Sequence, residues 1–309
     1  MLAPLDECDE LFAAIRAATD GRVIRTLLEE LLADYRVLSM QLGRGSVFWR
    51  GRQVNDEPFD DANALAYPPE HLTPSGRLNA KGAPVLYAST REDTVLHEIG
   101  ASPGSVVQFL GFRVRENKSI RLAAIGEFFH VYKTGYLKTL GRDVNNAISK
   151  VLNSLGSERG RRLVYIDAFL ASLLAEPDTR DGAYLHTQVL AQLALEKSKA
   201  DGLFYPSVQE GLGMNLAILP PVFDDAAFPV RCHVARLQRR RAFGVMEFEV
   251  LTEAEDMDDS GRFTWRAPLA PNVARFFGMT KREKEFLAQS PTHDGNTFLS
   301  LKKLYTSDA

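Results

Sequence analysis

A short apolar run that passes directly into a helical pattern constrains the fold of this chain more than any other feature. Residues 84–89 are continuously apolar up to Ser89 and too few for a helix, which predicts a buried strand. Thr90 follows as a candidate helix cap, with Asp93 three residues later, and Pro103 with Gly104 ends the helical pattern. A strand that leads straight into a helix predicts an α+β fold in which the helix packs on a sheet.

The other patterns place helices on both sides of this unit and strands mainly behind it. Helices are expected within 7–41, over most of 120–200 with a well-marked helix at 184–199, and at 281–289. Strands are expected at 46–50, 105–115, 202–205, 215–219, 230–237, 243–251 and 263–266. The proline-rich stretch 53–75 is expected to be irregular, Pro220-Pro221 to close the central unit, and 253–260 to form an acidic turn.

These patterns divide the chain into three parts. Residues 1–45 form a helical N-terminal segment, 46–221 a catalytic core with a helical insertion, and 222–309 an extension that contains β-strands. The apolar stripe at 24–38 has helical spacing, with Asp20 placed to cap its helix, and it needs a cover. Either the rest of the chain or a partner could supply that cover.

Composition excludes several classes of function. The 309-residue chain has an ordinary globular composition, with 45% hydrophobic and 25% charged residues. Its net charge of −3 and pI near 6.1 give it no overall positive charge that would attract nucleic acid or anionic lipid. The densest basic run, 236–241, is interpreted as a solvated strand end. Two distant cysteines, an acidic N-terminus and no long apolar run predict a protein of the reducing cytoplasm without a membrane segment.

Common cofactor and metal motifs are missing from the sequence. The six histidines lack zinc-ligand spacing, and the acidic run at 256–261 has Ala267 where a calcium loop requires a glutamate. Neither the glycine-rich dinucleotide motif nor the P-loop occurs. We therefore expect no metal and no recycled cofactor.

Four residues instead stand out as candidates for a site. Arg50 ends a predicted strand and Arg77 follows Gly76 in a turn; a guanidinium suits phosphate because its planar fork bonds two oxygens. Tyr87 lies near the end of the apolar strand, at the rim of a sheet. Glu98 lies on a mostly apolar helix face, where a carboxylate needs a partner or a function.

The order of these residues resembles the RES domain, a bacterial family named for its Arg, Glu and Ser. The resemblance rests on Phe-Trp-Arg-Gly-Arg at 48–52, Pro-Ser-Gly-Arg-Leu-Asn at 74–79 and Ala-Pro-Val-Leu-Tyr-Ala-Ser-Thr at 83–90. Val-Leu-His-Glu at 95–98 and Gly-Leu-Phe-Tyr-Pro-Ser at 202–207, followed by Gly213 and Asn215, complete it. It implies a mixed-sheet core similar to ADP-ribosyltransferases.

The resemblance also implies an activity and a site. Members of this family degrade NAD, by hydrolysis or with inorganic phosphate as co-substrate, and commonly act as toxins that a helix-turn-helix antitoxin inhibits. Arg50 and Arg77 would hold phosphate or ribose, with Arg52 the alternative to Arg50. Tyr87 would stack near nicotinamide, and Glu98 and Ser207 would lie at the reacting ribose.

Two other functions stay open at this point. The chain could transfer ADP-ribose to a macromolecule, or it could be an interaction protein built on a degenerate RES core. The apolar stripe at 24–38 motivates the second alternative, since an exposed stripe would indicate a partner or a homo-oligomer seam.

Overall fold

The fold was derived from a computed structural model. It describes residues 5–267, with the exception of 34, 45, 56, 135–147, 149, 177–183, 208–212 and 243–244. It also describes residues 280–282 and 285. The predicted helix at 281–289 therefore lies largely outside the described residues. Within them the fold is mixed α/β, as the sequence predicts.

The described strands form one sheet with the order β1-β5-β6-β7-β3-β2-β4-β8-β9-β10. Its strands are β1 (Leu38–Leu42), β2 (Val47–Val54), β3 (Leu86–Ser89), β4 (Val106–Val114), β5 (Ile120–Ala124), β6 (Gly202–Pro206), β7 (Met214–Ile218), β8 (Ala227–Arg240), β9 (Met246–Met257) and β10 (Phe263–Arg266). Only β5 and β6 pair in parallel among these strands, so the sheet is mixed.

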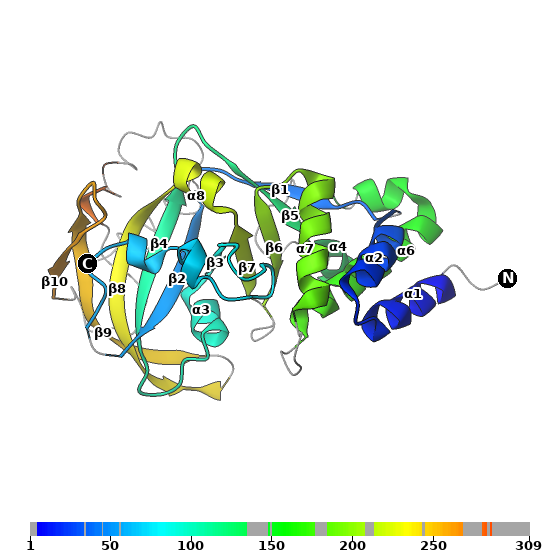
Figure 1. The fold of residues 1–309 in the computed structure, drawn as a ribbon. Coiled ribbons are helices and arrows are strands. Elements are labelled where there is room, and N and C mark those ends of the chain that lie inside the picture. The colour runs from blue at the N-terminus through cyan, green and yellow to red at the C-terminus, as the bar shows by residue number, and fades with distance from the viewer. Residues whose placement is uncertain are drawn as a thin grey trace, which may run out of the picture.

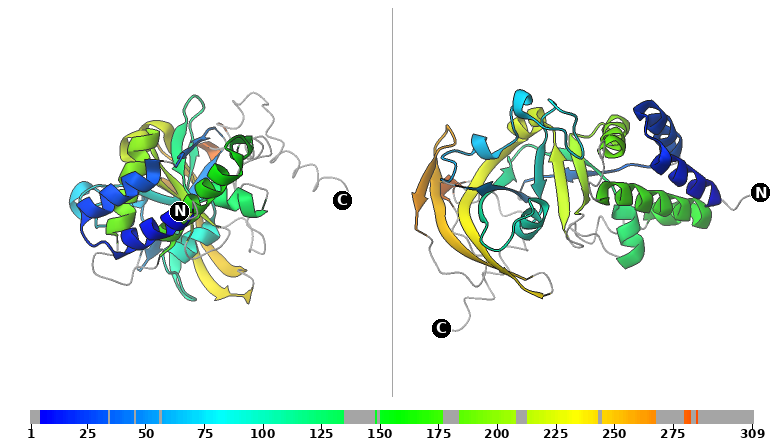
Figure 2. Two further views of the ribbon diagram at one scale, coloured as in Figure 1. Left: turned by 90° about the vertical axis from the view of Figure 1, so that its right-hand side faces the viewer. Right: turned by 60° about the horizontal axis from the view of Figure 1, so that its bottom comes forward.

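The helices gather mainly beyond β6 on one side, whereas β8–β10 form the opposite side (Figures 1 and 2). They are α1 (Asp6–Ala17), α2 (Gly21–Ala33), α3 (Glu92–Glu98), α4 (Glu127–Thr134), α6 (Gly156–Ala175), α7 (Leu185–Ser198) and α8 (Pro220–Ala226), with short 3₁₀ turns at Asn63–Leu65 and Glu70–Leu72. Parallel strands need a long crossover connection, and α4, α6 and α7 lie between β5 and β6 in the chain. The helical insertion is thus the crossover that the parallel pair requires.

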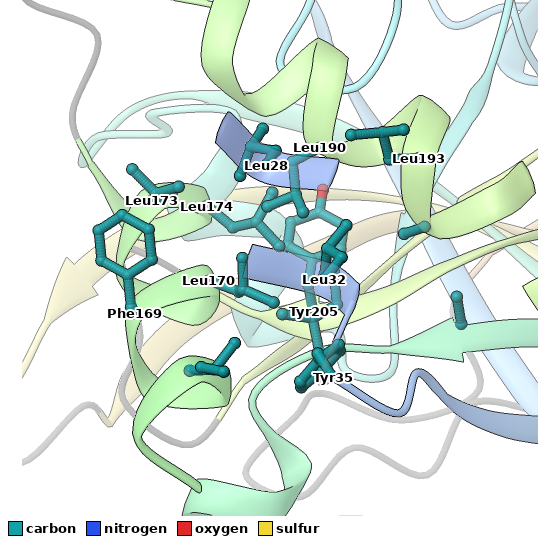
Figure 3. Packing of buried hydrophobic residues seen from close by; sticks show 14 of the residues in the cluster. Leu28, Leu32, Tyr35, Phe169, Leu170, Leu173, Leu174, Leu190, Leu193 and Tyr205 are labelled. Carbon is teal, nitrogen blue, oxygen red and sulfur yellow. The ribbon is translucent and has the colours of Figure 1, made fainter. Parts of the chain in front are cut away.

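The apolar stripe of α2 is buried within the chain. Ile24, Leu28 and Leu31 are at most 1% exposed and belong to the same cluster as the inner faces of α1, α6 and α7. Figure 3 shows Leu28 and Leu32 facing leucines of α6 and α7. Oδ1 of Asp20 accepts hydrogen bonds from two backbone amides of the first turn, which confirms the predicted cap.

A buried carboxylate ties the helical layer to the sheet. Asp167 of α6 is fully buried and accepts hydrogen bonds from the hydroxyl of Tyr35 at 2.6 Å and from the backbone amides of Gly126 and Phe129. Burial raises the pKa of Asp167, although its three donors act in the opposite direction. The network joins the segment that follows α2 to α4 and α6 where β5 ends.

Two further clusters cover the rest of the sheet. The face opposite the helical layer packs Phe48, Leu86 and Leu216 under the 59–67 loop and α8. The third cluster lies under α3, where Val95 and Leu96 pack on Trp49 and neighbouring apolar residues of β4, β8 and β9. Helix α3 therefore sits directly on the centre of the sheet.

Several predicted elements were wrong. Residues 38–42 form strand β1 rather than the end of a helix, because Met40 and Leu42 are buried at a period of two between exposed neighbours. The sequence also missed β5 (Ile120–Ala124), whose alternate residues are buried on opposite faces so that its apolar run reads equally well as helix.

Corrections also apply at element boundaries. Arg91, not Thr90, precedes the first turn of α3, and it has no side-chain cap bond; the Thr90 backbone amide donates instead to the carbonyl of Met214. Pro220, where the sequence predicts the end of the central unit, begins α8, as proline favours a first helical turn. Residues 253–257, predicted as a turn, continue strand β9.

The predicted C-terminal extension joins the central sheet. Strand β8 pairs with β4 over most of its length, and β9 and β10 follow in order. The three-part division remains a prediction, but the first helices and the last strands both pack on the core. Across the part of the chain that the structure describes, no helix is long and apolar enough to span a membrane.

Candidate functional site

The candidate site lies at the centre of the sheet, where β6, β7, β3 and β2 are neighbours. Ser89 is the register partner of Asn215, and Asn215 in turn is the partner of Tyr205 on β6. Residues that face each other across antiparallel strands share one face of the sheet. Ser207, two residues beyond Tyr205, continues that face because its amide donates to the carbonyl of Gly213 at 2.9 Å.

Glu98, the last residue of α3, meets these polar side chains. Its Oε1 accepts a hydrogen bond from Oγ of Ser207 at 2.6 Å and another from Nδ2 of Asn215 at 2.8 Å. Both donors are buried, whereas the side chain of Glu98 is exposed. The structure thus brings together Glu98 and Ser207, two of the predicted residues, at the accessible end of a buried polar row.

The hydroxyl of Tyr87 holds the glycine-arginine turn. It accepts a hydrogen bond from the backbone amide of Leu78 at 2.8 Å and donates to Oδ1 of Asn79 at 2.8 Å. Burial raises the pKa of Tyr87 to about 12, so the phenol stays protonated at neutral pH. With the hydroxyl occupied on both sides, the ring is the part of Tyr87 that a ligand could use.

The turn itself leaves little room. Gly76 and Asn79 form an isolated antiparallel bridge, and a Cβ at Gly76 would lie 2.4 Å from Oδ1 of Asn79. Helix α7 clamps the turn from outside: Nε2 of Gln188 donates to Oγ of Ser75 and to the carbonyls of Gly76 and Asn79. Glycine is needed here because the backbone and an amide side chain approach so closely.

Arg77 projects from this turn toward the end of α6. Its Nη1 donates to the carbonyl oxygens of Leu174 and Glu176, each at 2.8 Å. These carbonyls lie at a helix C-terminus, which attracts a cation. These contacts place the guanidinium beside the helical layer, and the turn connects it to Tyr87.

Arg50 is fixed between two strands. Strands β2 and β3 share one register pair, Trp49 with Ser89, and Nη1 of Arg50 donates to the carbonyl of Tyr87 at 2.8 Å. Its Nε is buried and has no hydrogen-bond partner among the described residues. Burial, followed by the charge of Arg52, lowers the pKa of Arg50 to about 10, so it is still a cation at neutral pH.

Arg52 serves the neighbouring loop. Its Nη1 donates to the carbonyl of Ala64 at 2.6 Å, and its guanidinium lies 4.6 Å from the centre of the Phe59 ring. Arg52 is exposed and contacts the 59–65 loop through these two interactions, whereas Arg50 has a buried donor without a partner among the described residues.

The sequence prediction gave no role to Ser89, Asn79, Gln188 or Asn215. Each is a polar residue in or beside an element that buries apolar neighbours, and Ser89 and Asn215 are each 3% exposed. For Ser89 and Asn215, polarity on strands of otherwise apolar residues was the available signal. Their pairing depends on strand register, which the sequence did not reveal.

Metal binding finds no support in the part of the chain that the structure describes, where no group of three or more His, Cys, Asp or Glu side chains could hold an ion. Comparison with known families gives one match: the family model of the RES domain covers residues 47–238, more than half of the chain. The matched range contains all six predicted site residues and continues through most of β8. No curated protein and no solved structure matches the chain significantly.

Proposed function

This chain belongs to the RES domain family, and on that premise we propose that it cleaves NAD between nicotinamide and ribose. The observation that carries the proposal is the hydrogen-bonded group of Glu98, Ser207 and Asn215 beside Tyr87 on β3. The reaction needs a carboxylate, an aromatic surface and a cationic donor, and Glu98, Tyr87 and Arg50 are the residues that would supply them.

The carboxylate would act on the ribose. Breaking the bond between C1′ and the nicotinamide nitrogen sends the bonding electron pair to the leaving base and leaves positive charge on the sugar. The negative charge of Glu98 would stabilise that charge and orient a ribose hydroxyl. Ser207 supports this role because its hydroxyl already donates to the carboxylate.

The remaining residues would bind the rest of NAD. The guanidinium of Arg50, a partly exposed side chain, would donate to a pyrophosphate or ribose oxygen, and the exposed part of the Tyr87 ring would be a surface for nicotinamide. Arg77 would contribute through the turn that it shares with Leu78 and Asn79. Arg52 would act on the ligand only after release from the 59–65 loop.

The acceptor would be inorganic phosphate or water. In phosphorolysis a phosphate oxygen bonds to C1′ and gives ADP-ribose phosphorylated at that carbon, whereas water gives ADP-ribose and a proton. As an NAD-consuming enzyme of this family the chain would act in the cytoplasm as a toxin, restrained by a helix-turn-helix antitoxin. Burial of the α2 stripe removes the motive for the interaction-protein alternative.

Nicotinamide release from NAD, followed by chromatography with and without phosphate, tests the proposal. Release that Glu98→Gln abolishes while the fold is kept is the expected result, and dependence on phosphate would identify phosphorolysis. ADP-ribose attached to an added protein or nucleic acid would indicate macromolecular transfer instead. Full turnover by Glu98→Gln would overturn the assignment of the carboxylate.

A further inference from the structure

We infer that Asn215, held in place by Ser89, is a positioning residue that fixes the Glu98 carboxylate and leaves Oε2 as the oxygen that meets the substrate. The contacts stand by themselves, and the catalytic consequence rests on the proposed function. Nδ2 of Asn215 donates to Oε1 of Glu98 at 2.8 Å, and Oγ of Ser89 donates to Oδ1 of Asn215 at 2.7 Å.

Strand register builds this row of side chains. Ser89 and Asn215 are direct partners across β3 and β7, so their side chains leave the same face of the sheet. Each is 3% exposed, and both lie beneath the exposed carboxylate at the end of α3. A buried hydroxyl and amide each need a partner, and each supplies one to the other.

The direction of the hydrogen bonds follows from the chemistry of the groups. Since a carboxylate only accepts, the Asn215 amide must turn its nitrogen toward Glu98. Its oxygen then faces Ser89, whose hydroxyl can donate. With the amide reversed, Oδ1 would lie against the carboxylate and the contact would become repulsive. Glu98 therefore sets the orientation of the amide, and the hydroxyl of Ser89 holds the amide there by donating to Oδ1.

Glu98 needs such support because of its place in the chain. It ends α3, where the exposed carbonyls of a helix C-terminus disfavour negative charge. The hydrogen bonds that Ser207 and Asn215 donate to Oε1 offset this unfavourable interaction with the helix carbonyls. Oε2 accepts no hydrogen bond from the described residues, and the side chain is exposed. Within the described part of the chain, one oxygen is thus anchored and the other accepts no hydrogen bond.

A fixed Oε2 would affect the chemical step more than NAD binding. A carboxylate displaced by about 1 Å can cost on the order of 100-fold in rate, whereas contacts to the distant phosphates are unchanged. For folded Asn215→Leu we expect kcat to fall about 10- to 100-fold with KM within about twofold of the wild type. Ser89→Ala should give a smaller loss in kcat.

Asn215→Asp separates positioning from a structural role. At about pH 8 two carboxylates would face each other, and the variant should be as impaired as Asn215→Leu. Toward about pH 5 the pair shares one proton, and a protonated Asp can again donate to Glu98. Activity relative to the wild type should therefore recover at low pH in Asn215→Asp but not in Asn215→Leu. A merely structural role would give no such pH-dependent difference.

A measurement without turnover tests the same contact. The Asn215 side-chain amide signal in ¹H–¹⁵N spectra, identified by its loss in Asn215→Leu, should shift in Glu98→Ala and in Ser89→Ala. Asn63→Ala, which removes an exposed amide bonded to the carbonyl of Ser260, is the matched control for activity and spectra.

The outcomes separate this inference from the proposed function. If the wild type releases no nicotinamide, the proposed function fails and the amide signal alone decides whether Asn215 holds Glu98. The positioning role is overturned if the wild type is active but folded Asn215→Leu keeps its kcat. It is also overturned if the Asn215 amide signal does not shift in Glu98→Ala. Loss confined to KM would also contradict it.

Discussion

Ser207 lies 109 residues after Glu98 in the chain, yet its hydroxyl donates a 2.6 Å hydrogen bond to Oε1 of that carboxylate. The bond joins the end of β6 to the end of α3 and makes the two residues one group. Because the hydroxyl proton already points at Glu98, we interpret Ser207 as a group that orients the carboxylate.

Ser207→Ala should therefore retain part of the activity. Removing one of two donors to Oε1 leaves Asn215 in place, so we expect kcat for nicotinamide release to fall about tenfold rather than to background. Ser154→Ala, in which an exposed serine bonded to a helix carbonyl is changed, is the control. Complete loss of activity in a folded Ser207→Ala protein would instead indicate direct participation of the hydroxyl.

Arg50 and Arg52 should differ as NAD ligands. Arg50→Gln removes the buried donor that has no described partner, and we expect KM for NAD to rise at least about tenfold, because charge-assisted hydrogen bonds contribute roughly 1.5–3 kcal/mol. Arg52→Gln, which loses a bond to a loop carbonyl, should raise KM far less. Steady-state kinetics on both variants checks the order, and the reverse order would make Arg52 the phosphate ligand.

The residues of this site can be predicted from the sequence, whereas their contacts cannot. Glu98 and Ser207 could be identified because each lies in a short motif, and the strands around them have clear apolar patterns. Asn215 and Ser89 acquire their role only through the register of β3 on β7, two strands far apart in the chain. Strand β1 was missed because Tyr35 and Leu38 continue the spacing of α2 by coincidence.

Tyr87→Phe should destabilise the glycine-arginine turn. The change leaves the amide of Leu78 and Oδ1 of Asn79 without their shared hydroxyl, and an unmade hydrogen bond of this kind costs about 1–3 kcal/mol. Urea unfolding should show that loss. Tyr132→Phe, at an exposed position, is the control and should unfold like the wild type. An unchanged midpoint in Tyr87→Phe would mean that the turn holds without the phenol.

Acid should destabilise the protein through His233. This side chain is 1% exposed and stacks on Phe109 with ring centres 4.9 Å apart. Burial, followed by the charge of Arg231, lowers the pKa of His233 to about 3 from its ordinary 6.5. Between about pH 3 and pH 6.5 the imidazole is therefore protonated in the unfolded chain but neutral in the folded protein. The contribution of His233 to the free energy of unfolding is complete above about pH 6.5 and is lost as the pH falls toward about 3. Unfolding free energies over that range should fall less steeply in His233→Phe, and equal slopes would assign the acid sensitivity to other groups.

Gly202 links the stability of the sheet to the geometry of the site. A Cβ at this position would lie 2.2 Å from the carbonyl oxygen of Ala217, a backbone atom that cannot move without shifting β7. Gly202→Ala should therefore force β6 and β7 apart, lower the urea midpoint markedly and displace Ser207 and Asn215, which those strands carry. Gly43→Ala, where nothing lies within 4 Å of the added atom, is the matched control and should leave both stability and activity unchanged. If Gly202→Ala unfolds like the wild type, the close approach of the two strands is not required. Stability restored by lower temperature without recovery of activity would show that the register of β6 on β7, and not folding alone, sets the position of the Glu98 donors.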